Sequence, residues 1–168
     1  KNHYFKFMDI KHIQHLYWRA GFGVTQKKLQ KLQRKTKEDI VSGLFEQSEN
    51  YQELKIDLVK FDELRYGNYK ELRNKLGLEG VKSLTKESRN EVRNLNLAWI
   101  DRLKNTDAIL VEKMTLFWAN VFVCKDQNVW NIQNYNNVLR THALGHFGDF
   151  VKAIAHEPSM IDYLNNKQ

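Results

Sequence analysis

Apolar residues recur every three or four positions along almost the whole chain, and no segment sustains the strict alternation of a half-buried strand. The clearest example is a segment from Phe147 to His156, whose apolar residues share one face of a helix. They are Phe147, Phe150, Val151, Ile154 and Ala155. The pattern predicts an all-α fold, an irregular multi-helix bundle of about seven to nine helices.

A second strong pattern follows Thr106, which is the expected N-cap of a helix that runs to about Cys124. Its main apolar stripe consists of Leu110, Met114, Phe117, Val121 and Cys124. Neighbouring positions are apolar as well, so the helix would be apolar on most of its circumference. Because such a helix has little solvent-facing surface, we expect it at the centre of the bundle.

Residues 1–168 are expected to form a single domain with three regions. Residues 1–46 are a basic cluster of short helices, residues 47–84 an irregular connection, and residues 85–168 the core bundle. Nothing between these regions resembles a Gly/Ser-rich or Pro-rich linker.

Capping residues predict where several helices begin. Thr25 and Thr36 are plausible N-caps of two short helices in the basic cluster. Asn68, followed three residues later by Glu, is typical of a capping box, and Gly77 is expected to end that helix. Thr85 is the expected N-cap of the first helix of the core bundle.

Charge is distributed unevenly along the 168 residues, which carry 27 Lys and Arg, 20 Asp and Glu, and a formal net charge of +7. The first 37 residues hold ten of the cations and one acid, Asp9. Such a segment can attract nucleic acid or anionic lipid, but a solvated basic face is commoner, and we favour it. The candidate polyanion contacts are Lys27, Lys28, Lys31, Arg34, Lys35 and Lys37. No apolar stretch approaches the roughly 18 residues that a membrane span needs.

Two histidines have the spacing of metal ligands. His142 and His146 are four residues apart, which places two imidazoles on one face of a continuous helix. Gly145 lies between them, however, and a helix break there would separate the rings. We therefore predict no metal site and no cofactor, and we keep His142, His146 and Asp149 as weak candidate ligands.

Amide side chains are dense between residues 127 and 137, and amides of this density can line a polar groove for sugars or peptides. The candidate groove residues are Arg19, Asn134, Asn137 and Arg140. Ordinary surface positions in a chain rich in Asn and Lys are the alternative, and we prefer it.

The single cysteine, Cys124, excludes an internal disulfide and a cysteine-based zinc site. Its place at the end of an apolar helix favours a core or boundary residue over a nucleophile. Signatures of P-loop NTPases, α/β-hydrolases, dinucleotide-binding folds and HExxH metalloproteases are absent from the sequence. Whether the chain is an enzyme stays open.

Three stretches, in this order, resemble motifs of one known family. Residues 15–23 (HLYWRAGFG) resemble an opening HLLxRAGFG signature, and residues 112–118 (EKMTLFW) resemble a central helix motif. Residues 140–168 are similar, almost throughout, to the stretch RxxALGxFxxLLxAVAxDPAMLxYLDN. These motifs are those of the bacterial family catalogued as domain of unknown function 1800, and residues 47–83 add nothing to the resemblance.

The resemblance implies that the chain is the N-terminal part of a longer protein, because family members run to several hundred residues. Their next segment is an acidic PNENxARExxELFTLG helix. Many members look exported, which implies the periplasm or the cell surface. The family's FWHxHF histidines correspond to Ala119 and Val121, and the Asp of YLDN to Asn165, so a site built on those groups would be lost here.

Three functional hypotheses remain. The leading one is a non-catalytic or catalytically incomplete helical module of an exported bacterial protein, which acts through protein or surface-polymer contacts. Its partner would be another protein or the remaining part of its own chain. The alternative is the N-terminal part of a hydrolase-like enzyme whose catalytic groups lie further along the chain. A second alternative is nucleic-acid binding through the basic N-terminal cluster.

Overall fold

The computed structural model describes residues 7–66 and 68–165, and within them the chain forms nine α-helices, one 3-10 turn (η1) and no strand. The predicted all-α, multi-helix fold is therefore confirmed. The elements are α1 (Ile10–Ala20), α2 (Gln26–Leu32), α3 (Lys37–Glu49), η1 (Val59–Phe61), α4 (Asp62–Tyr66), α5 (Tyr69–Asn105), α6 (Ile109–Val121), α7 (Val129–His142), α8 (Phe147–Ala155) and α9 (Pro158–Tyr163).

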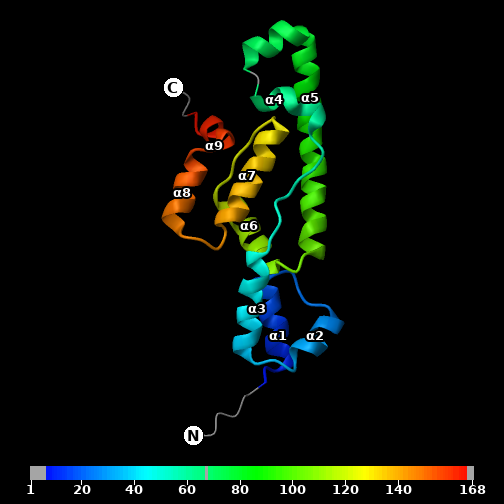
Figure 1. Cartoon of the computed structure of the whole chain (residues 1–168), viewed down its shortest axis with the longest axis vertical. Coiled ribbons are helices and arrows are strands. Elements are labelled where there is room, and N and C mark those ends of the chain that lie inside the picture. Colours follow the sequence, from blue (N-terminus) through cyan, green and yellow to red (C-terminus); the bar gives the residue numbers. More distant parts are fainter. Residues whose placement is uncertain (1–6, 67, 166–168) are drawn as a thin grey trace.

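The first three helices form one end of an elongated molecule (Figure 1). Their buried apolar residues make a core of their own, to which the first residue of α6 also belongs. These residues are Ile13, Tyr17, Leu29, Leu32, Ile40, Leu44 and Ile109. Helix α6 thus begins inside the N-terminal core and joins it to the rest of the bundle.

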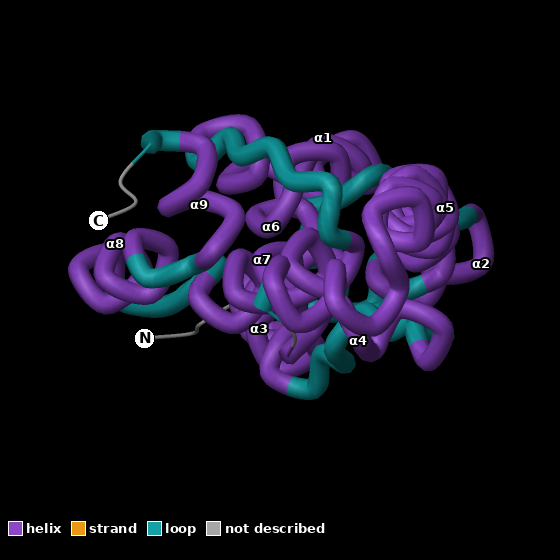
Figure 2. The backbone as a smooth tube through the Cα atoms, turned by 90° about the horizontal axis from the view of Figure 1, so that it is seen from above, coloured by secondary structure: helices purple, strands orange, loops and turns teal. Residues whose placement is uncertain are grey.

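Helix α7 lies between α5 on one side and α8 on the other, in both views of the chain (Figures 1 and 2). Two further apolar cores fill the spaces on its two sides. One includes Leu95 of α5 and Val129 of α7, and the other includes Leu139 of α7 and Phe150 of α8. Helix α7 is therefore the element around which the larger part of the molecule is built.

Three of the predicted helix caps are confirmed. The Thr25 hydroxyl accepts a hydrogen bond from the Lys28 amide at 3.3 Å, and the Asn68 side chain accepts one from the Glu71 amide at 2.9 Å. Thr36 begins α3 with a complete capping box. These bonds satisfy amides that have no partner within the helix, which is why polar residues at these positions fix where the helices begin.

The prediction that Thr85 begins a helix is wrong, because α5 runs from Tyr69 to Asn105 with a kink at Gly77. Gly77 has φ 69°, a left-handed conformation that a residue with a side chain rarely adopts. The chain resumes a helical course after this kink. Thr85 then lies inside the helix, where its hydroxyl donates to the Val81 carbonyl at 2.8 Å.

The predicted apolar faces of α6 and α8 are only partly buried. Helix α6 begins at Ile109, two residues later than an N-cap at Thr106 predicts, and it buries Val111 and Thr115. Phe117 and Val121, which belong to the predicted buried stripe, are more than half exposed. In α8, Phe150 and Ile154 are buried whereas Phe147 is exposed. Both helices therefore present apolar side chains to solvent.

Candidate functional site

A buried ion pair joins the two C-terminal family-like motifs. Glu112 of α6 and Arg140 of α7 have relative exposures of 1% and 0%, respectively. The Arg140 guanidinium donates from Nε to Glu112 Oε1 at 2.7 Å and from Nη2 to Glu112 Oε2 at 3.1 Å. This two-point geometry matches the planar fork of arginine to the planar carboxylate.

Residues of α5 and of α7 itself complete the hydrogen bonds of this pair. The Trp99 indole of α5 donates to Glu112 Oε2 at 2.9 Å, and Arg140 Nη1 donates to Asn137 Oδ1 at 2.7 Å. The Arg102 guanidinium of α5 lies 3.9 Å from Glu112 Oε1. Because a buried charge is tolerated only when it is paired and hydrogen-bonded, this cluster ties α5, α6 and α7 together.

A cavity of about 620 Å³ opens beside this cluster, between the end of α3, the chain after it and the last turns of α5. Glu112 and Arg102 lie in its wall together with polar residues, among them Gln47, Tyr51 and Asp101. Burial and the neighbouring Arg140 lower the pKa of Arg102, an effect that Glu112 opposes. The Arg102 guanidinium is already engaged, because it also donates to the carbonyls of Gln52 and Glu53.

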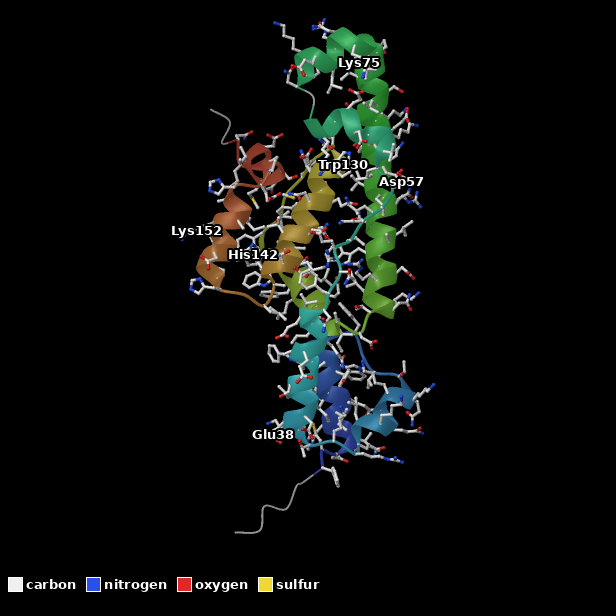
Figure 3. The ribbon with its side chains drawn as sticks, in the orientation of Figure 1. Glu38, Asp57, Lys75, Trp130, His142 and Lys152 are labelled. Carbon is white, nitrogen blue, oxygen red and sulfur yellow. The ribbon has the colours of Figure 1, made fainter. Side chains whose placement is uncertain are left out.

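The candidate groove residues are only partly brought together. Asn134 and Asn137 both line a hollow of about 360 Å³ beside Trp130, at the upper end of α7 (Figure 3). Arg140 does not line it, because its guanidinium is buried against Glu112. Arg19 does not line it either and is exposed on α1.

Two amides of this hollow bind the protein's own backbone, whereas Asn134 donates to the Glu157 carboxylate at 2.9 Å. The Asn137 side chain accepts from the Leu54 amide at 2.7 Å and donates to the Leu54 carbonyl at 3.0 Å. Gln133 accepts from the Ile56 amide at 2.9 Å. These bonds pair the segment after α3 with α7, so Asn137 and Gln133 position a connection of the fold.

Two of the three candidate metal ligands, His146 and Asp149, contact each other, whereas the ring of His142 contacts Phe150. His142 ends α7, and its ring stacks on Phe150 of α8 at 5.7 Å between centroids (Figure 3). His146 precedes α8 after the break around Gly145, and its Nδ1 lies 3.4 Å from Asp149 Oδ2. Within residues 7–66 and 68–165, no group of three or more His, Cys, Asp or Glu side chains could hold a metal ion.

The candidate polyanion contacts lie on α2, on the turn after it and at the start of α3. Five of the six are exposed, and they are Lys27, Lys31, Arg34, Lys35 and Lys37. Lys28 is the exception, because its Nζ lies 3.2 Å from Asp107 Oδ1 and 5.6 Å from the centre of the Tyr17 ring. The exposed members therefore lie on the N-terminal helices, at one end of the molecule (Figure 1).

Cys124 lies at the boundary of the core, as its place in the sequence predicts. Burial raises the pKa of its thiol to about 11, and a hydrogen bond with Tyr135 only partly opposes this effect. The Tyr135 hydroxyl also donates to the Phe122 carbonyl. A thiol with a raised pKa is a poor nucleophile at neutral pH. Cys124 is therefore better explained as a residue that packs against the core than as a nucleophile.

An array of aromatic rings extends from the core between α6 and α8 to the surface. The Trp118 ring lies 5.1 Å from that of buried Phe150 and 5.8 Å from that of exposed Phe147, between centroids. Phe117 also packs against Trp118, edge-on, with 4.9 Å between the ring centroids. The outer rings of this array, Phe117 and Phe147, are each more than half exposed.

The sequence alone did not reveal two of these features. Glu112 lies in a family-like motif, but the sequence around it indicates no role, because its partner Arg140 is 28 residues away along the chain. The outward rings were missed because periodicity identifies an apolar face and not what covers it. The signal that could have indicated the buried pair is a Glu within a helix that is mostly apolar, because a buried charge needs a partner.

Comparison with known proteins agrees with the resemblance of the motifs. No curated protein and no solved structure matches the chain. In the part of the chain that the structure describes, none of the helices is both long and apolar enough to cross a membrane. Residues 15–168 match a family described as "Protein of unknown function (DUF1800)". This match covers nearly the whole chain, so the chain belongs to that family.

Proposed function

We propose that this chain is a helical module that acts by binding another polypeptide through the aromatic face of α6 and α8. This aromatic face is defined by the exposed rings of Phe117 on α6 and Phe147 on α8, which both contact Trp118. The observation that carries the proposal is the exposure of its two phenyl rings, 52% for Phe117 and 57% for Phe147, although both contact a ring array that continues into the core.

The exposed rings of this face are apolar surface in contact with water, which is unfavourable. Burying an aromatic side chain in an interface removes a large apolar area from water and is among the strongest contributions to binding. Contiguous apolar patches on soluble chains commonly mark interaction sites. The rings are also held in place by Trp118, whose indole donates to the Ala143 carbonyl at 3.0 Å. A partner would therefore meet a surface that is already ordered.

The partner that the family resemblance supports is a later part of the same polypeptide. Family members run to several hundred residues, and the segment that follows in them is a helix with apolar and acidic residues. A site of action in the periplasm or at the cell surface rests on the same resemblance. Cell fractionation of the native organism, with detection of the chain in each compartment, tests that location.

The test supplies the polypeptide that the native gene encodes after residue 168 as a separate chain and measures its binding to residues 1–168 by calorimetry. We expect binding that weakens at least about tenfold in the double variant Phe117→Ser/Phe147→Ser. Phe45→Ser is the matched control, because Phe45 of α3 is about equally exposed and lies outside the aromatic face. It should leave the affinity unchanged.

Two outcomes would contradict the proposal. A gene that ends at residue 168 would remove the proposed partner. If Phe45→Ser weakens binding as much as the double variant does, exposed apolar groups act nonspecifically. Circular dichroism of each variant, compared with wild type, separates lost binding from lost folding.

A further inference from the structure

A second hollow, separate from the aromatic face, lies between the N-terminal helices and the end of α5. Its volume is about 910 Å³, and its wall includes Trp18, Phe22 and Val24 on one side and Ile100 and Leu103 on the other. The loop that joins α1 to α2 passes below the lower end of α5 in Figure 1. The hollow is therefore formed where the basic N-terminal end of the molecule meets the long helix.

Apolar side chains at this hollow are unusually exposed. Trp18 has 69% of its surface exposed, and Ile100 and Phe22 are also exposed. Trp18 and Phe22 flank the turn after α1, in which Gly21 packs against Ile109 of α6. This contact anchors the turn to the core, so both aromatic rings are carried by a fixed backbone and not by a free loop.

The charges around the hollow are mostly positive. Lys28 and Lys104 lie in its wall, and Lys113 Nζ lies 4.9 Å from the centre of the Phe22 ring. The acid in the wall, Asp107, is already paired with Lys28 at 3.2 Å. The exposed cations of α2 extend the positive surface beyond this wall. An incoming group would therefore gain from negative charge at its edges and from apolar groups at its centre.

We propose that this hollow is a docking site for an acidic segment of a protein partner that inserts a bulky apolar side chain between Trp18 and Ile100. Aliphatic walls from Val24, Leu103 and Ile100 suit an apolar anchor. A single-stranded nucleic acid is the less favoured occupant, because base stacking needs aromatic faces in a strongly cationic groove, and here Asp107 neutralises one of the two wall lysines.

This inference does not depend on the proposed function. The hollow shares no residue with the aromatic face of α6 and α8. A failure of one site is therefore separable from a failure of the other by the variants used.

The experiment selects peptides from a displayed library of random sequences for binding to the whole chain, followed by affinity measurements on the selected peptides. We expect them to share a large apolar residue flanked by Asp or Glu. Trp18→Ala should weaken their binding about thirtyfold or more, as expected for a central aromatic anchor. Lys104→Glu should weaken it about two- to fivefold, with a loss of salt dependence.

Tyr69→Ala is the matched control, because Tyr69 at the start of α5 is also a largely exposed aromatic residue but lies outside the hollow. It should leave peptide affinity unchanged, and thermal unfolding should show that Trp18→Ala remains folded. Selected peptides that ignore Trp18→Ala, or that lack acidic residues, overturn the proposal. The proposal is also overturned if the chain binds an oligo(dT) strand of about 20 nucleotides and Trp18→Ala abolishes that binding. This result would assign the hollow to nucleic acid.

Discussion

The cations of α2 and the arginine of α7 differ in what surrounds them. Lys27 and Lys31 are exposed at one end of the molecule, whereas Arg140 is enclosed between helices and bonded to Glu112 and Asn137. The first two retain most of their hydration. Arg140 has exchanged water for fixed acceptors on two helices.

This difference separates two roles of charge in one chain. A buried pair contributes little net stability when both partners are present, but it becomes costly when one partner is removed, because the other charge is left without water. An exposed cation contributes almost nothing to folding and stays available for a ligand. The Glu112–Arg140 pair is therefore expected to act within the fold, and the α2 lysines at its surface.

The largest effect is expected from removing one member of the buried pair. Glu112→Ala should lower the free energy of unfolding by about 3–5 kcal/mol, because Arg140 is left charged and buried and the Trp99 indole loses its acceptor. Urea denaturation followed by circular dichroism measures the change.

Glu112→Gln is the control for this variant. It retains an oxygen that can accept from Arg140 or Trp99 but removes the charge, so it should be destabilised less than Glu112→Ala if hydrogen bonding carries part of the effect. Equal stability of Glu112→Ala and wild type would show that Arg140 does not depend on Glu112.

A smaller effect is expected at the contact between the turn after α1 and the start of α6. A Cβ added to Gly21 would lie 2.8 Å from Ile109 Cδ1 and 3.1 Å from Ile109 Cβ, so Gly21→Ala requires the Ile109 side chain or the turn after α1 to shift. We expect a loss of about 1–3 kcal/mol in the free energy of unfolding, typical of overpacking. Thermal and urea unfolding give the value.

Gly43→Ala tests whether this loss is specific to the contact. Gly43 lies within α3, and a Cβ there meets nothing within 4 Å, so the substitution should stabilise the protein by about 0.5–1 kcal/mol. If Gly21→Ala is as stable as Gly43→Ala, the packing of the N-terminal core against Ile109 is loose.

Local signals in the sequence predicted much of the fold. The period of the apolar residues is set by helix geometry, and the caps at Thr25, Thr36 and Asn68 act on amides within three residues, so both can be read from a short window. Thr85 shows the limit of such a window. Its sequence suits a cap, but the helix that continues after Gly77 has already begun and takes Thr85 into its interior.

The candidate site was less predictable because it depends on contacts between distant residues. From the sequence, Arg140 and Asn137 are both candidate groove residues, and neither the bond of Arg140 to Glu112 on α6 nor the bonds of Asn137 to Leu54 can be inferred from it. The same reason explains Phe117 and Phe147. Their spacing correctly identifies apolar faces, yet what covers a face is decided by helices elsewhere in the chain or by a partner.

The smallest effect is expected on α2, and its sign is informative. Lys27 and Lys31 lie four residues apart on α2, so their like charges repel. Lys27→Gln/Lys31→Gln should therefore raise the free energy of unfolding slightly, by about 0.2–0.5 kcal/mol, and the gain should vanish at high salt. Lys28→Gln should have the opposite sign, because it removes the contacts with Asp107 and the Tyr17 ring. Urea denaturation of both variants at low and high salt measures these changes. A loss of more than about 1 kcal/mol in the Lys27/Lys31 variant would mean that α2 depends on these cations for folding, and the contrast with Arg140 would fail.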